Sequence, residues 1–120
     1  MQEKTFVQDI ARTIYQKKGF DIVVLDVAHL TVITDYMVIA SGRSANQVKA
    51  LYDEVDECMA ERGLMLRRCE GQSEGRWIVM DYGPILVQLF HQEEREFYNL
   101  ERLWSDGTNR VELTFNQDED

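Results

Sequence analysis

Apolar residues dominate both sides of a Gly-Pro pair in residues 76–90, and this pattern predicts a β-hairpin with two chemically different faces. Side chains of a strand point alternately to its two sides, and a two-residue turn at Gly83-Pro84 would set Tyr82 opposite Ile85. One predicted face is almost wholly apolar and belongs in a core: Ile78, Met80, Tyr82, Ile85, Val87 and Leu89. The other face combines aromatic, apolar and polar groups: Trp77, Val79, Asp81, Leu86, Gln88 and Phe90.

This second face has two interpretations. Trp77 and Phe90 are contact residues if the face is open, and ordinary core residues if another layer covers it. Aromatic side chains are common in cores and in interfaces, so the hairpin alone favours neither interpretation. A one-residue shift of the turn would exchange the faces. Gly83 supports the register given above, because the first central position of such a turn needs a positive φ.

The remaining pattern predicts one α/β domain. Apolar residues recur at helical spacing in residues 5–18, 45–62 and 93–104, and Ser44 is a suitable N-cap for the second helix. In the last helix the predicted apolar face consists of Phe97, Leu100, Leu103 and Trp104. Residues 21–27, 35–40 and 64–70 predict three strands that precede the hairpin.

The order helix, strand, strand, helix, three strands, helix predicts a mixed five-stranded sheet with helices mainly on one face. Part of the opposite face would then be bare. We expect a single domain over residues 1–105 and a C-terminal tail over residues 106–120 that is partly extended or disordered. Val111, Leu113 and Phe115 alternate with polar residues, which is typical of an added edge strand, whereas residues 117–120 are expected to be disordered and solvated.

Composition restricts the classes of protein that remain. The chain has 120 residues, of which 44% are hydrophobic and 29% charged, as expected for one globular domain. No apolar run approaches the roughly 18 residues of a membrane span. Residues 1–4 lack the features of a signal peptide, and two cysteines are too few for a disulfide framework, so we expect a cytoplasmic location.

The charge balance indicates the kind of partner. Acidic residues number 22 and basic residues 13, which gives a formal net charge of −9. Phosphate backbones are bound by clusters of lysine and arginine, so dominant direct binding to RNA or DNA is not expected. A basic protein surface is the natural complement.

The sequence offers little catalytic chemistry. A Gly42-Arg43-Ser44 turn before a helix resembles phosphate-binding turns, but such turns need Gly and Ser for structural reasons as well. Asp81 lacks the neighbouring carboxylates that metal-dependent nucleotidyl transfer requires. We therefore expect no enzyme activity, no cofactor and no metal. The residues that could have suggested otherwise are separated in the sequence or suit structural roles: His29, His91, Cys58, Cys69 and the acidic run 93–96, which is either a helix start or a charged rim of the docking face.

Four pieces in order resemble the ribosomal silencing factor family, also called the Iojap family: residues 35–44 with 47–51, 70–71, 77–83 and 95–104. The resemblance implies a homodimer with a nucleotidyltransferase-like fold that has lost its metal-binding acids. It also implies a translation repressor that binds large-subunit ribosomal protein number fourteen on the inter-subunit face. Bound there, the repressor would block joining of the small subunit when nutrients are short.

The resemblance also implies the contact residues, namely Glu70, Trp77, Asp81, Tyr82, Gln88 and Phe90. The pattern of faces directs Tyr82 inward, so its inclusion rests on its closeness to the turn. Two positions depart from the family, because Pro84 replaces a common acidic residue and Gln88 a common histidine. Two alternatives remain open: a nucleotidyltransferase-like nucleotide binder or enzyme that uses Gly42, Ser44 and Asp81, and a dimeric adaptor for another protein.

Overall fold

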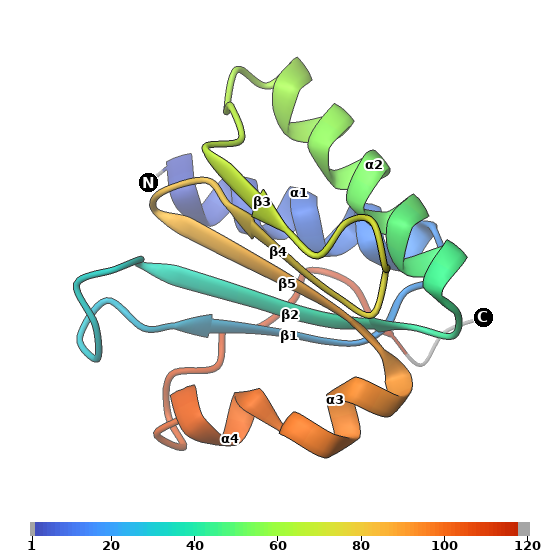
Figure 1. The fold of residues 1–120 in the computed structure, drawn as a ribbon. Coiled ribbons are helices and arrows are strands. Elements are labelled where there is room, and N and C mark those ends of the chain that lie inside the picture. The colour runs from blue at the N-terminus through green and yellow to red at the C-terminus, as the bar shows by residue number, and fades with distance from the viewer. Residues whose placement is uncertain (1, 118–120) are drawn as a thin grey trace.

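A five-stranded mixed sheet in the order β1-β2-β5-β4-β3 forms the centre of the computed structural model, which describes residues 2–117 (Figure 1). The parallel pair β2–β5 joins two antiparallel parts, β1–β2 and β5–β4–β3. The strands are β1 Phe20–Asp26, β2 Tyr36–Gly42, β3 Arg68–Glu70, β4 Trp77–Asp81 and β5 Ile85–His91. The helices are α1 Gln2–Gln16, α2 Ala45–Glu61, α3 Gln92–Tyr98 and α4 Leu100–Trp104.

The hairpin β4–β5 has the register that the sequence predicted. Trp77 pairs with Phe90 and Asp81 with Leu86, and the Tyr82 N–H donates to the Ile85 carbonyl at 2.9 Å across the turn. Gly83 adopts a φ of +94°, which explains the glycine at this position. All side chains of the predicted core face are fully buried: Ile78, Met80, Tyr82, Ile85, Val87 and Leu89.

Helix α2 begins and ends where its capping residues predict. The Ser44 hydroxyl oxygen accepts a hydrogen bond from the Gln47 N–H at 3.1 Å, and Gly63 follows the helix with a φ of +84°. Its stripe of Val48, Leu51, Val55 and Met59 is fully buried against the sheet. The predicted helix of residues 45–62 is therefore confirmed to within one residue.

The cap makes a first testable prediction. We expect Ser44→Ala to lower the free energy of unfolding by about 1 kcal/mol, because the Gln47 N–H loses its side-chain acceptor. Urea denaturation followed by circular dichroism measures the change. Ser73→Ala, in an exposed loop, is the matched control and should leave the midpoint unchanged. Equal loss in the two variants would contradict the role of the cap.

Helices cover both faces of the sheet, and the two long helices lie on the same face. Helices α1 and α2 pack on one face, and the short helices α3 and α4 lie on the other (Figure 1). Leu100 and Trp104 of α4 pack on a second apolar cluster made of Val23, Leu25, Val27, Met37, Ile39 and Phe90. The mixed five-stranded sheet is confirmed, but the opposite face is less bare than expected, because the chain turns back over it directly after β5.

The predicted single helix of residues 93–104 is wrong in one respect. Asn99 adopts a left-handed conformation with a φ of +48°, which ends α3 and starts α4 in a new direction. Helical spacing therefore does not continue from one half to the other. Leu100 and Trp104 face the sheet, whereas Phe97 and Leu103, predicted for the same face, are 80% and 75% exposed.

The tail does not form the added strand suggested by its alternating pattern. Residues 109–117 run along the outer edge of β1, joined to it by an isolated bridge between Leu25 and Arg110. Val111, Leu113 and Phe115 pack against the core from this edge. Of the end expected to be solvated, residues 118–120 lie outside the described residues. Among the described helices, none has the length and apolar character required to cross a membrane.

Candidate protein-binding surface

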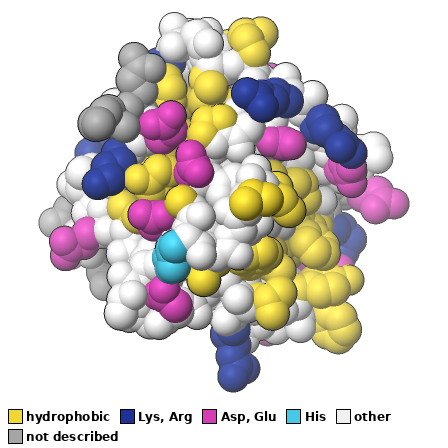
Figure 2. Space-filling model, turned by 90° about the vertical axis from the view of Figure 1, so that its left-hand side faces the viewer, with side chains coloured by type: hydrophobic (Ala, Val, Ile, Leu, Met, Phe, Trp, Pro, Cys, Tyr) yellow, Lys and Arg dark blue, Asp and Glu magenta, His cyan; other side chains and the backbone are white. Residues whose placement is uncertain are grey.

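The outer face of the sheet is open along most of β4, which α3 reaches only at Trp77, through Tyr98. Trp77, Val79, Asp81 and Leu86 are half-buried there, and Phe97, Tyr98 and Leu103 project beside them from the short helices. Figure 2 shows the largest group of exposed apolar side chains on the right-hand side of its view, with smaller groups at the top and on the left. We call Trp77, Phe97, Tyr98 and Leu103 the aromatic surface.

Aromatic rings run in series from the core to solvent. The buried Phe90 ring stacks on Trp77 with centroids 4.9 Å apart, Trp77 contacts Tyr98 at 4.8 Å, and Tyr98 meets Phe97 edge-on at 5.0 Å. The exposed fraction rises along this series from 0% at Phe90 to 48% at Tyr98 and 80% at Phe97. Exposed aromatic side chains on a rigid base are typical of protein interfaces.

The indole of Trp77 is fixed by a polar contact. Its Nε1–H donates to the Gln88 Oε1 atom at 2.9 Å, and the Gln88 amide donates to the Met37 sulfur at 3.4 Å. The indole N–H is therefore satisfied inside the protein. A partner would meet the ring carbons of Trp77 in one defined orientation, so little side-chain freedom would be lost on binding.

Three of the six expected contact residues are buried. Phe90 and Tyr82 are fully buried and Gln88 is 5% exposed, so the expected exposure of the outer hairpin residues Gln88 and Phe90 is wrong. Phe90 lies in the apolar cluster that Leu100 and Trp104 cover. Tyr82 points inward, as the alternation predicted, and its hydroxyl donates to Asp56 at 3.1 Å. Burial, and then the neighbouring Asp56 carboxylate, raise the pKa of Tyr82.

The other three residues remain accessible. Trp77 belongs to the aromatic surface, and Glu70 and Asp81 lie near it on the same side of the sheet, because Glu70 pairs with Val79 across β3–β4. Glu70 is exposed and bonds Arg68 at 3.2 Å, an exposed ion pair of small energetic value. Asp81 accepts from the Gly83 N–H at 2.8 Å and so also supports the turn.

Sequence reasoning missed the exposed residues of the two short helices. Their exposure depends on the left-handed Asn99, since a continuous helix would have directed Phe97 and Leu103 toward the sheet. Asparagine adopts this conformation more readily than most residues, which was the one available signal. A single asparagine within a helical pattern does not predict such a break by itself.

A partly buried ion pair holds the two short helices on the sheet. Arg95 is 7% exposed, and its Nε–H donates to both carboxylate oxygens of Glu101 at 3.0 and 3.1 Å. Its Nη1 donates to the Ser41 hydroxyl of β2 at 2.8 Å. Burial is the largest single influence and would raise the pKa of Glu101, but the hydrogen bonds from Arg95 and the backbone, together with the charges of Arg95 and Arg110, outweigh it, so the pKa is lowered. The pair thus fixes the position from which Phe97, Tyr98 and Leu103 project.

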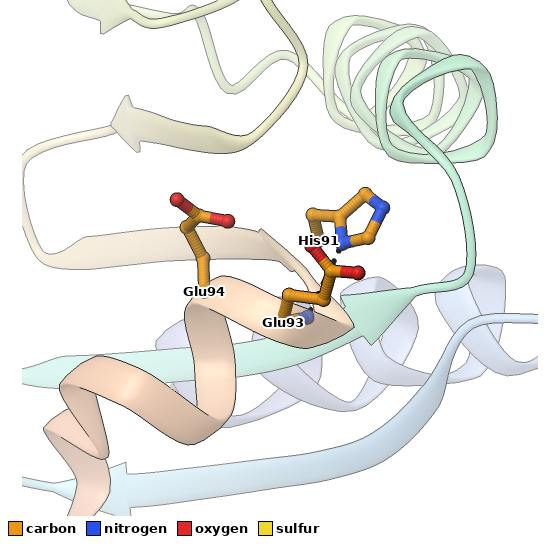
Figure 3. Close-up of side chains that lie close together, drawn as sticks. All are labelled: His91, Glu93 and Glu94. Atoms are coloured by element: carbon orange, nitrogen blue, oxygen red, sulfur yellow. Dashed lines mark hydrogen bonds between the residues drawn. The ribbon is translucent and has the colours of Figure 1, made fainter.

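His91, Glu93 and Glu94 form a compact group at the start of α3 (Figure 3). Their ligand-type atoms lie within 4.8 Å of one another, but each side chain already has a partner. The His91 Nδ1 atom accepts from the Glu93 N–H at 3.2 Å, and Arg76 pairs with Glu93 at 3.0 Å and with Glu94 at 2.7 Å. Helix capping and ion pairing therefore explain the group. The acidic run lies at a helix start, as one of its two interpretations predicted.

The turn before α2 does not form a site together with Asp81. The Arg43 N–H donates to the Gln47 side chain at 2.7 Å, and the Ser44 hydroxyl oxygen is used by the helix cap. Gly42 pairs with His91 at one end of the parallel strands, whereas Asp81 pairs with Leu86 at the other end of β5. The residues of the nucleotide-binding alternative thus lie at opposite ends of the sheet.

Comparison with known proteins decides the family. The family model described as "Ribosomal silencing factor during starvation" matches residues 1–120. The chain belongs to the ribosomal silencing factor family. A ribosomal silencing factor of Bacillus subtilis is 36% identical over 107 residues, which are 89% of this chain and 91% of that protein.

More distant relatives and a solved structure agree with this assignment. A mouse protein named for mitochondrial assembly of the ribosomal large subunit is 31% identical over 93 residues, which are 75% of this chain and 41% of the relative. The crystal structure of a Chromobacterium violaceum protein is 28% identical, covers 99% of this chain and 98% of its own, and superposes with a TM-score of 0.84. The silencing factor family is associated with ribosomes and is not a known enzyme family.

Proposed function

We propose that this silencing factor represses translation by binding the large ribosomal subunit through the aromatic surface. The observation that carries the proposal is the ring series that ends in exposed Tyr98 and Phe97 on a base fixed by Gln88 and Arg95. Membership of the silencing factor family supports the ribosome as the target of binding, and the name of the mouse relative refers to the large subunit. Neither the surface nor its use requires a catalytic group.

The proposed partner on the ribosome is large-subunit protein number fourteen, on the inter-subunit face. Ribosomal proteins are mostly basic, and a basic partner suits a chain with a net charge of −9. Glu70 and Asp81 beside the aromatic surface are the acidic groups that we expect to face it. Phe90 and Gln88 support this surface from below, whereas Tyr82 holds the hairpin turn to the core on the other face of the sheet. The complex forms in the cytoplasm without dominant nucleic-acid binding, and the free protein is a homodimer.

Silencing on this proposal is steric, because a domain docked on the inter-subunit face occupies space that the small subunit needs. We expect the protein to prevent association of purified subunits when it is mixed with large subunits first. Light scattering after addition of small subunits measures this directly. Trp77→Ala should leave association at the rate seen without protein. Normal association in the presence of saturating wild-type protein would contradict the steric mechanism and favour an adaptor for another partner.

A further inference from the structure

The two edges of the sheet are protected in different ways. β3 is three residues long and exposes Arg68 and Glu70, and a short charged strand is a poor template for another chain. β1 is seven residues long and contains the apolar run Ile22-Val23-Val24-Leu25. A strand of this length and composition pairs readily with other chains when its edge is open. The β1 edge therefore needs a separate cover.

Residues 107–117, which we call the guard segment, provide this cover. The Val111 N–H donates to the Val24 carbonyl at 2.7 Å, and the Asp26 N–H donates to the Asn109 carbonyl at 2.8 Å. Farther along, the side-chain amide of Gln117 makes the two hydrogen bonds that a neighbouring strand would make with Ile22. It accepts from the Ile22 N–H and donates to the Ile22 carbonyl, both at 2.9 Å. The outward-facing backbone of β1 is thus engaged at Ile22, Val24 and Asp26.

The guard segment also contacts α1, where the side-chain amide of Gln8 forms hydrogen bonds with its backbone. Gln8 donates to the Glu112 carbonyl at 2.8 Å and accepts from the Thr114 N–H at 3.1 Å, and Phe115 lies 4.9 Å from the Tyr15 ring. The inward side chains are half-buried and alternate with exposed Glu112, Thr114 and Asn116. The segment is held by two backbone–backbone hydrogen bonds, by the amides of Gln8, Asn109 and Gln117, and by Arg12 on Thr114 and Phe115. Its backbone forms only one isolated bridge with β1, so it can leave the edge without unpairing any strand of the sheet.

We propose that the guard segment blocks a strand-pairing surface on β1, and that the occupant of this surface after displacement is the same edge of a second copy. The register favours self-pairing. Two antiparallel β1 strands centred on Val24 place Ile22 opposite Asp26. This register pairs the residues whose backbone N–H and C=O groups point away from β2, and no two aspartates lie directly opposite each other. The surface is separate from the aromatic surface, so this inference goes beyond the proposed function.

The test uses the full-length chain carrying Val111→Pro, Phe115→Asp and Gln117→Ala. Together these changes remove the hydrogen bond from the Val111 N–H, the ring contact with Tyr15 and the hydrogen bonds of the Gln117 amide with Ile22. We expect the mass measured by analytical ultracentrifugation at high concentration to rise at least twofold above that of the wild-type protein, because every protomer then has an uncovered edge that pairs with another. Hydrogen exchange should be faster at the Ile22 and Asp26 amides at low concentration. Glu112→Ala, an exposed change in the same segment, is the matched control and should behave as wild type.

A synthetic peptide of residues 107–117 adds a reversal step. Added to the triple variant, it should return the mass to the wild-type value, whereas a peptide with the Val111→Pro and Gln117→Ala changes should not. Unchanged mass and unchanged amide exchange would overturn the proposal. Faster exchange without added mass would show an uncovered edge that does not pair, and would overturn the proposed occupant. If the triple variant fails to fold, Gln117→Ala alone must still accelerate exchange at Ile22, and no acceleration there would overturn the guard role.

Discussion

Phe90→Ala is expected to lower the free energy of unfolding by about 3–5 kcal/mol, the usual cost of removing a fully buried aromatic ring. Phe90 is 0% exposed and lies in the cluster that packs against Trp77, Leu100 and Trp104. The substitution would leave a cavity beneath α4 and remove the base on which the Trp77 ring stacks. Urea denaturation followed by circular dichroism measures the loss.

The matched control is the same substitution at the exposed end of the ring series. Phe97→Ala removes a side chain that is 80% exposed, so its effect on stability should lie within about 0.5 kcal/mol. The contrast between the two phenylalanines tests the description of the outer face. Equal stability of the two variants would mean that Phe90 is not covered as the structure has it.

Trp77→Ala is expected to weaken binding to large subunits by about 2 kcal/mol or more, which is roughly a 30-fold rise in the dissociation constant. The half-buried indole is the central ring of the series, and its removal also leaves Tyr98 without the contact that positions it. The dissociation constant of labelled protein for purified large subunits measures the effect. Circular dichroism of the variant at the same temperature shows whether it remains folded.

Two further substitutions distinguish residues that contact the partner from residues that only stabilise the fold. Phe97→Ala should weaken binding without loss of stability, because its ring contributes contact area and little packing. Met65→Ala, another exposed apolar residue (69% exposed) located after α2 and outside the aromatic surface, should bind as wild type. If Met65→Ala weakens binding as much as Trp77→Ala, the aromatic surface is not the specific contact.

The sequence predicted best where local chemistry leaves few alternatives. The hairpin register follows from a positive-φ glycine and strict alternation, and the structure has the predicted pairing of Trp77 with Phe90. Helix α2 likewise follows from its cap and its apolar stripe. In both elements the determining interactions lie within a few residues of each other, so the sequence contains them directly.

The sequence could not predict which face the chain covers after β5. That outcome depends on Asn99, whose left-handed conformation breaks a helical pattern, and on the Arg95 contact with Ser41, 54 positions away in the sequence. Phe90 was consequently expected to be open, while the exposed Phe97 and Leu103 were expected in an apolar stripe. The cover of the β1 edge depends similarly on Gln117, 95 positions from Ile22.

Sedimentation of the wild-type protein with purified ribosomal subunits in a sucrose gradient tests the central claim most directly. We predict that the protein migrates with isolated large subunits, does not migrate with small subunits, and stays at the top of the gradient when Trp77 is replaced by alanine. Wild-type protein that stays at the top in the presence of large subunits, or a folded Trp77→Ala variant that migrates with them unchanged, would contradict the account.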